Sequence, residues 1–327
     1  MNRNKELVKN TIIILIGKIC TQAITFVLLP IYTNYLSTEE YGTVDLVITY
    51  ISLLAPLISL QLEYAAFRFL IDVRNNENEK KKIITNVMGA LSILTFLCIF
   101  IFAIVYSIFK FNNCIYLFLI LIITMFANML LQIARGEGKN TDYTIASFIA
   151  GASNAILSII FVVFLKTGIT GIFLSMIISN LSCFIYLFIK TKLYIYLDFK
   201  LKDKKVISRL LKYSIPMIPN SICWWVISIS DRTIISIFLG LSANGIYSVA
   251  AKFSGLIVTI YNMFNLSWTE SVSLHINDED ADSYLSDVFN ATTKIFACGF
   301  LAIIAIMPNA FPIFIVKDYV GASNFIP

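Results

Sequence analysis

The chain alternates long apolar runs with short polar breaks. A stretch of about 20 apolar residues is long enough to cross a hydrocarbon core about 30 Å thick, and the strict alternation of a barrel strand is absent. The runs predict transmembrane helices near residues 11–36, 44–70, 84–109, 114–134, 143–165, 169–190, 211–239, 244–274 and 284–311. The pattern therefore predicts an all-α polytopic membrane protein with nine transmembrane helices.

Composition agrees with a membrane protein. The 327 residues are 58% hydrophobic and 14% charged, whereas soluble proteins are about 45–50% apolar and about 25% charged. The formal net charge is +5, but the Lys and Arg residues cluster between the apolar runs, as positive-inside topology requires. We therefore expect no nucleic-acid partner. The scattered cysteines and the single histidine, His275, predict neither a disulfide framework nor a metal site.

The distribution of basic residues predicts the orientation of the chain in the cell membrane. The basic N-terminus leads into a first run without a cleavage site, so we expect an uncleaved helix. With the N-terminus in the cytoplasm, that side receives most of the Lys and Arg, including the clusters at 74–82 and 190–212, and the other side receives only Lys110, Lys166 and Lys317. Such a bias sets orientation strongly.

An internal repeat organises the chain. The turn at 35–43 recurs at 238–246, and the same offset of 203 residues carries 84–109 onto 284–311 within boundary error. Six spans separate the copies, which predicts a parallel repeat of the kind found in two-lobed transporters. We expect a six-helix N-terminal lobe (1–190), a basic cytoplasmic linker (191–210) and three helices of a second lobe (211–327). The second lobe would be incomplete, so we expect a C-terminally truncated chain.

Several motifs resemble one transporter family. The segments Leu29-Pro30-Ile31-Tyr32, Leu36 to Gly42 and Leu62 to Phe69 are similar to the opening of Wzx-type oligosaccharide flippases. The segments Tyr213 to Pro219, Ser230-Asp231-Arg232, Phe238-Leu239-Gly240 and Gly245 to Lys252 resemble a second block of that family. These flippases belong to the MOP superfamily, which includes the multidrug and toxin extrusion (MATE) transporters. The resemblance covers essentially the whole chain.

The resemblance implies two six-helix lobes around a cation-lined lumen. It implies translocation of undecaprenyl-pyrophosphate-linked oligosaccharide to the outer leaflet by alternating access, for surface polysaccharides such as O-antigen. We expect a transporter that is not an enzyme and has no cofactor. We expect an ion gradient to power the transport, with the ion unspecified. Expected partners are the lipid-linked oligosaccharide, anionic lipids and other polysaccharide assembly proteins.

Ionisable residues inside the spans are candidate site residues, because such residues are costly in lipid and face a cavity or a partner. They are Lys18, Asp45, Glu63, Asp231, Arg232, Lys252, Glu270 and Lys294. Lys18, Arg232, Lys252 and Lys294 would form two cationic tiers for a pyrophosphate, since ammonium and guanidinium groups bind phosphate oxygens strongly. The alternative is that each cation snorkels to the interface or pairs with a carboxylate.

Adjacent helical residues point to different sides, so Asp231 and Arg232 need separate partners. One prediction is a structural ion pair between Asp231 and Lys252, called the Asp231–Lys252 lock, which would leave Arg232 free to bind substrate. The alternative is that Lys252 itself binds the ligand. Glu63 and Asp231 are candidate coupling or structural acids.

Further candidates lie around the seventh span. Pro216 and Pro219 predict a hinge or a fixed kink, and Trp224 and Trp225 would either stack on sugar rings or pack in the core. Residues 200–212 predict a basic amphipathic helix at the cytoplasmic interface, which would bind anionic lipid or recruit substrate.

Other functions stay open at this point. A drug or metabolite antiporter of the same fold would expose carboxylates in its lumen. A membrane glycosyltransferase or polymerase would need a larger extramembrane segment than the longest loop, about 20 residues at 191–210, provides. A non-transporting membrane scaffold is a further alternative.

Overall fold

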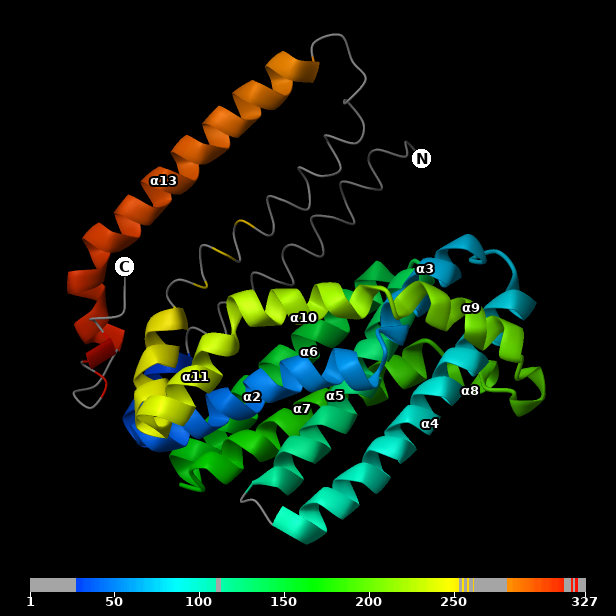
Figure 1. Ribbon diagram of the computed structural model, residues 1–327, viewed down its shortest axis with the longest axis horizontal. Coiled ribbons are helices and arrows are strands. Elements are labelled where there is room, and N and C mark those ends of the chain that lie inside the picture. The colour runs from blue at the N-terminus through cyan, green and yellow to red at the C-terminus, as the bar shows by residue number, and fades with distance from the viewer. Residues whose placement is uncertain are drawn as a thin grey trace.

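The described part of the protein is built from helices (Figure 1). The computed structural model describes residues 28–109 and 113–252, helix α13 and positions 255, 258, 261, 319, 321 and 322. Within these residues there is no β-strand. The predicted all-α fold is therefore confirmed.

The element bounds follow the apolar runs closely. Residues 28–35 and 241–252 are helical. The other elements are α2 (Thr38–Ile58), α3 (Leu62–Asp72), α4 (Glu77–Phe109), α5 (Cys114–Gly136), α6 (Asn140–Ser158), η1 (Ile159–Phe164), α7 (Ile169–Lys190), α8 (Leu193–Tyr196), η2 (Phe199–Leu201), α9 (Lys204–Ser214), α10 (Met217–Ser228), α11 (Ser230–Leu239) and α13 (Ala281–Phe314).

By length and composition, five described helices can cross a membrane: α2, α4, α5, α6 with η1, and α7. The bent segment from α9 to α11 makes a sixth when taken as one span. Most of the first and eighth predicted spans lie outside the described residues, so the count of nine stays a prediction.

Two predicted spans are broken rather than continuous. The run at 44–70 is divided at residues 59–61, where Leu60 and Gln61 take left-handed backbone angles (φ 50° and 58°) that a right-handed helix does not contain. The run at 211–239 is divided twice, at residues 215–216 and again at Ile229, where the chain bends by 49°. Discontinuous helices of this kind supply the binding sites of many transporters.

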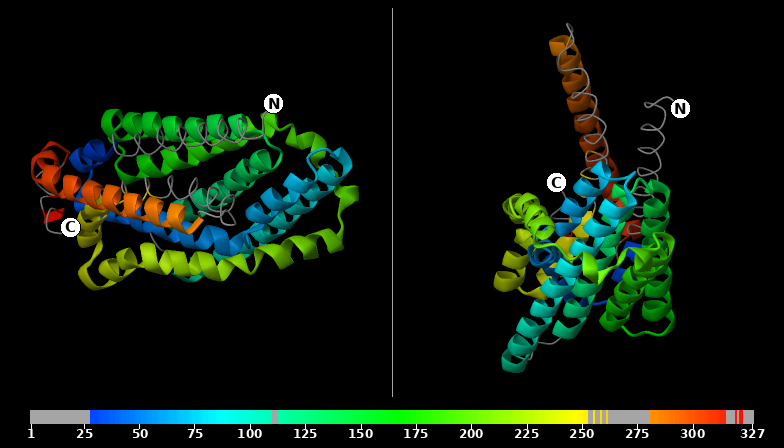
Figure 2. Two further views of the ribbon diagram at one scale, coloured as in Figure 1. Left: turned by 90° about the horizontal axis from the view of Figure 1, so that it is seen from above. Right: turned by 90° about the vertical axis from the view of Figure 1, so that its right-hand side faces the viewer.

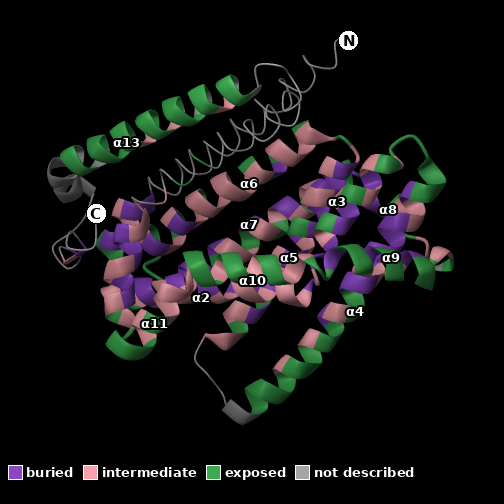
Figure 3. Ribbon diagram, turned by 45° about the horizontal axis from the view of Figure 1, so that its top comes forward, coloured by how far each residue is buried: buried purple, intermediate pink, exposed green. Residues whose placement is uncertain are grey.

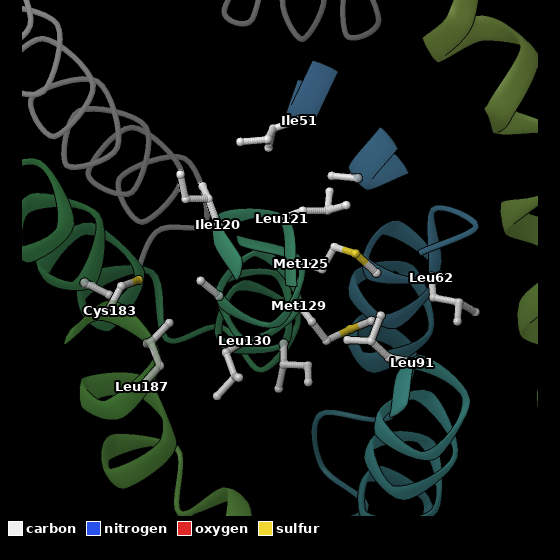
Figure 4. Close-up of a cluster of buried hydrophobic side chains, with 14 of the residues drawn as sticks. Ile51, Leu62, Leu91, Ile120, Leu121, Met125, Met129, Leu130, Cys183 and Leu187 are labelled. Carbon is white, nitrogen blue, oxygen red and sulfur yellow. The ribbon is translucent and has the colours of Figure 1, made fainter. Parts of the chain in front are cut away.

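The core surrounds α5, which packs against α2, α3 and α7. Figure 4 shows Leu121, Met125 and Met129 of α5 in contact range of buried side chains from the neighbouring helices. Outside this core, large apolar side chains such as Phe96 and Phe100 on α4 are exposed, and the outer half of α4 is exposed along its length (Figure 3). An exposed apolar belt is the expected outer surface of a membrane-spanning bundle.

The predicted linker (191–210) is docked on the end of α4 that is predicted to be cytoplasmic, and α9 continues beyond it to Ser214. Asn86 holds it by two hydrogen bonds, donating from Nδ2 to the carbonyl of Leu201 (2.9 Å) and accepting at Oδ1 from the N–H of Asp203 (2.8 Å). Lys82 Nζ pairs with the Asp203 carboxylate at 2.9 Å, and this bond lowers the pKa of Asp203.

Within the linker, α9 is the amphipathic helix that the sequence predicts, although it begins at Lys204 rather than at 200. Asp203 caps its N-terminus by accepting from the N–H of Lys205. Val206 and Leu210 are buried, while Lys204 and Lys205 are exposed. The helix therefore presents its basic side away from the bundle.

Helix α13 lies apart from helices α2 to α9 (Figures 1 and 2). Tyr319, beyond the end of α13, contacts the bundle, because its hydroxyl donates to the carbonyls of Leu36 (3.0 Å) and Ser37 (2.9 Å). The turn at 35–43 is thus contacted by a segment nearly 300 residues further along the chain.

Candidate functional site

The two repeated turns meet face to face. Ser37 caps α2 with a capping box that it forms with Glu40, and Gly240 (φ 88°) separates α11 from the helix that begins at 241. A Cβ atom on Gly42 would overlap the carbonyl oxygen of Leu241, and one on Gly245 would overlap the carbonyl oxygen of Thr38. Only glycine permits this approach of the two backbones.

This contact is locally two-fold symmetric. Leu241 lies 203 residues after Thr38, and Gly245 lies 203 residues after Gly42. Gly42 therefore touches the carbonyl of Leu241, and its equivalent, Gly245, touches the carbonyl of Thr38, which is the equivalent of Leu241. Such a reciprocal contact is found in an isologous interface between two identical subunits. At this point, the offset found in the sequence corresponds to a physical contact between the two copies.

Further hydrogen bonds and ring contacts close the same end of the bundle. Asn244 Nδ2 donates to the carbonyl of Gly42 at 3.0 Å. The rings of Tyr41 and Tyr319 pack edge to face with centroids 6.2 Å apart, and Tyr41 and Tyr319 are buried. The first turns of α2 and of the helix at 241–252 are held together tightly here.

An ion pair joins α2 to α11, close to the glycine contact on α2. Arg232 Nε of α11 lies 2.9 Å from Asp45 Oδ2 of α2, with only 17% and 8% of the two side chains exposed. Neither atom makes an aligned hydrogen bond. The pair is therefore a close charge contact in a dry environment, without the directional bonds of a bidentate Arg–carboxylate pair.

Lys252 brings a second cation to this carboxylate. It lies within electrostatic range of both Asp45 and Arg232, and it lines a cavity of about 200 Å³ together with Asp45, Tyr32, Tyr41 and Asn154. Arg232 is thus paired with Asp45, and Lys252 lies near the same carboxylate without forming an ion pair with it. This group, Asp45, Arg232 and Lys252, is called the charged junction below.

Asp231 is a second carboxylate near the junction, within electrostatic range of Asp45. Its carboxylate accepts a hydrogen bond from the hydroxyl of Tyr247 and another, at 2.8 Å, from the N–H of Arg232. Within the described residues it makes no ion pair with Lys252. The predicted Asp231–Lys252 lock is therefore wrong, because Asp231 turns toward Tyr247 while Lys252 approaches Asp45.

The prediction that Arg232 lacks a carboxylate partner is also wrong. Asp45 appeared among the intramembrane ionisable residues, but nothing in the sequence assigned it to Arg232. The only available signal was that a carboxylate inside a span requires a partner. Which cation it meets depends on how α2 packs against α11, and the sequence pattern does not specify that packing.

Of the remaining predicted site residues, those that the structure describes lie outside the junction. Lys18 lies outside the described residues, and Lys294 is exposed on α13. Glu63 lies in the first turn of α3 and lines a separate pocket with Trp224 and Trp225. The substrate roles of these cations and the coupling role of Glu63 stay predictions.

The prolines of the seventh span mark the break between α9 and α10. Pro216 precedes α10 and Pro219 lies in its first turn, where a missing N–H costs little. The 49° bend falls ten residues beyond Pro219, at Ile229. The predicted break is present, and the hinge role of these prolines stays a prediction.

The charged junction has the chemistry of an anion site rather than of a metal site. Arg232 and Lys252 supply donors and positive charge, Asp45 lies between them, and Asp231 is a second carboxylate nearby. Across the described residues, no group of three or more His, Cys, Asp or Glu side chains is placed to hold a metal ion. Of the two cations of the junction, Lys252 lines the cavity, while Arg232 pairs with Asp45 beside it.

Solved structures share this architecture. An inward-facing multidrug resistance MATE family transporter of the MOP superfamily superposes with a TM-score of 0.72 at 15% identity, over 95% of this chain and 78% of that one. An outward-facing MATE family transporter of the MOP superfamily superposes with a TM-score of 0.64 at 16% identity, over 97% of this chain and 76% of that one. A MATE in the straight conformation superposes with a TM-score of 0.60 at 19% identity, over 98% of this chain and 76% of that one.

The protein is thus an all-α, multi-pass membrane protein with the MATE transporter fold. Residues 7–268 match the family model for polysaccharide biosynthesis proteins, and the chain belongs to that family. A search of curated proteins gives no match. The family match and the MATE-like fold together confirm the resemblance seen in the sequence.

Proposed function

We propose that the protein is a flippase that moves undecaprenyl-pyrophosphate-linked oligosaccharide across the cytoplasmic membrane by alternating access. The observation that carries the proposal is the charged junction, in which Arg232 pairs with Asp45 and Lys252 lies near the same carboxylate in a cavity lined by α2, α6 and α7. Membership of the polysaccharide biosynthesis family supports the glycan part of the substrate.

In this mechanism Asp45 holds Arg232 by their ion pair when no substrate is bound, while Lys252 lines the cavity without an ion pair to any described residue. The pyrophosphate carries more negative charge than one carboxylate, so it competes with Asp45 for the two cations. Loss of the Asp45–Arg232 pair removes one contact that joins α2 to α11, which allows the lobes to separate at this end. An ion gradient would reset the cycle, and Lys18 and Lys294 would serve other stages of translocation.

The decisive residue is Lys252, because it has no ion-pair partner within 4 Å among the described residues. Lys252→Ala is expected to reduce glycan export at least about tenfold, since a charge-assisted bond to phosphate contributes about 1.5–3 kcal/mol. Lys252→Arg, which keeps the charge, should retain part of the export. Export is measured as surface polysaccharide in a deletion strain carrying each variant, with membrane abundance measured in parallel.

Lys190→Ala is the control, because Lys190 is exposed at the end of α7. Normal export by Lys252→Ala would contradict the proposal.

A drug or metabolite antiporter is the second candidate, since Asp45 places a carboxylate in the cavity. Export of cationic dyes with unchanged surface polysaccharide in the deletion strain would favour that antiporter.

We also propose that the N-terminus is cytoplasmic and that the basic surface of α9 lies on anionic lipid. Reporter fusions after Lys82 and Lys205 should then be active in the cytoplasm, and fusions after Lys110 and Lys166 should be active outside. The expectation rests on the excess of Lys and Arg on one side of the spans. A cytoplasmic result after Lys166 would overturn the orientation.

A further inference from the structure

A second pocket lies where two broken spans face each other. Its volume is about 480 Å³, and it is lined by the end of α2, the start of α3, α5 and the segment from Asn220 to Ile229. The break at 59–61 and the bend at Ile229 both border it. Ligand pockets of about 300–1,000 Å³ hold small molecules or parts of larger ones.

The two tryptophans at this pocket have different roles. Trp225 is fixed, because its Nε1–H donates to the carbonyl of Thr49 at 3.0 Å. Trp224 is 63% exposed although it lies in the middle of an apolar span. The indole face of Trp224 is therefore available to a ligand, whereas Trp225 attaches α10 to α2.

Polar groups with open bonding capacity line the same pocket. The side-chain amides of Asn128 on α5 and Asn220 on α10 are exposed and make no hydrogen bond within the described residues. An amide that faces lipid without a partner is costly. Glu63 adds a carboxylate, and the hydrogen bond from Gln61 to Ser221 joins the two walls of the pocket.

This pocket and the charged junction follow one face of α2. Asp45, Ser52 and Pro56 are seven and four residues apart, which places them on the same side of the helix. At a rise of about 1.5 Å per residue, the junction and the pocket are roughly 10–16 Å apart along α2. One ligand with a charged end and a polar end would reach both.

We propose that this pocket binds sugar rings of the lipid-linked glycan while the pyrophosphate occupies the charged junction. The apolar C–H face of a pyranose stacks on the indole of Trp224, because an aromatic face suits an apolar surface with polar edges. Adjacent hydroxyls donate to Glu63 and exchange hydrogen bonds with the amides of Asn128 and Asn220. The inference rests on the proposed function and adds to it the place where the glycan is recognised.

The test compares two probes on the purified, detergent-solubilised protein by native mass spectrometry. One probe is the lipid-linked oligosaccharide extracted from cells that lack this gene, and the other is undecaprenyl pyrophosphate without a glycan. Trp224→Ala and Asn128→Leu should each weaken binding of the first probe about tenfold, as expected for loss of a stacking or hydrogen-bonding group. Neither change should alter binding of the second probe.

Two further variants serve as controls. Trp224→Phe keeps an aromatic face and should retain most of the affinity, and Ile227→Ala, at a 79% exposed position of the same helix, should change nothing. Unchanged binding of the glycosylated probe by both test variants, or equal weakening of both probes, would overturn the sugar site. If the unaltered protein bound neither probe, the proposed function itself would fail.

Discussion

Asp45→Ala is expected to destabilise the protein strongly and to lower its abundance in the membrane. The substitution leaves Arg232 without its carboxylate at a position where only 17% of the side chain is exposed. Removing one partner of a buried ion pair costs about 3–5 kcal/mol, because the remaining charge is uncompensated. Thermal unfolding in detergent and quantitative immunoblotting of membranes would measure the loss.

The double variant Asp45→Leu, Arg232→Leu separates stability from function. Replacing both partners by apolar groups is often neutral, so the double variant should regain most of the stability while export stays low. Arg68→Ala is the matched control, because Arg68 and Asp72 form an ion pair at 2.6 Å with about half of each side chain exposed, and exposed pairs contribute about 0–1 kcal/mol. Equal unfolding temperatures for Asp45→Ala and Arg68→Ala would contradict a structural role for the buried pair.

The sequence predicts where the helices lie because the bilayer imposes one requirement on every span. Runs of sufficient apolar length gave α4, α5, α7 and α13 to within a few residues, apart from an earlier start of α4 at Glu77. The break at Leu60 and Gln61 was missed, because neither residue is Gly or Pro and left-handed backbone is rare for such residues. Local composition carries no signal for it.

The charged junction was predictable only in part. An ionisable residue in a span signals a site, and on that basis Arg232 and Lys252 were identified. The identity of their partner depends on the contact between α2 and α11, which are almost 200 residues apart in the chain. The repeat predicts long-range contacts better than the ionisable residues do, since its offset pairs Gly42 with Gly245 and those two residues are in contact.

The glycine contact leads to the second prediction with a large effect. Gly42→Ala is expected to separate the first turns of α2 and the helix at 241–252, because the new Cβ would overlap the carbonyl oxygen of Leu241. Overpacking of this kind costs about 1–3 kcal/mol. Hydrogen–deuterium exchange should become about tenfold faster in residues 38–46 and 241–252, since 1.4 kcal/mol corresponds to a factor of ten in the opening equilibrium, and glycan export should fall.

The two-fold character of the contact makes the prediction more specific. Gly245→Ala should have about the same effect as Gly42→Ala, because its Cβ would overlap the equivalent carbonyl oxygen of Thr38. The two changes disrupt one contact, so the double variant should lose less than the sum of the single losses. Gly299→Ala is the control, since a Cβ there meets nothing within 4 Å, and it should leave exchange and export unchanged. If Gly42→Ala reduced export while Gly245→Ala did not, the two turns would not act as equivalent halves of one joint.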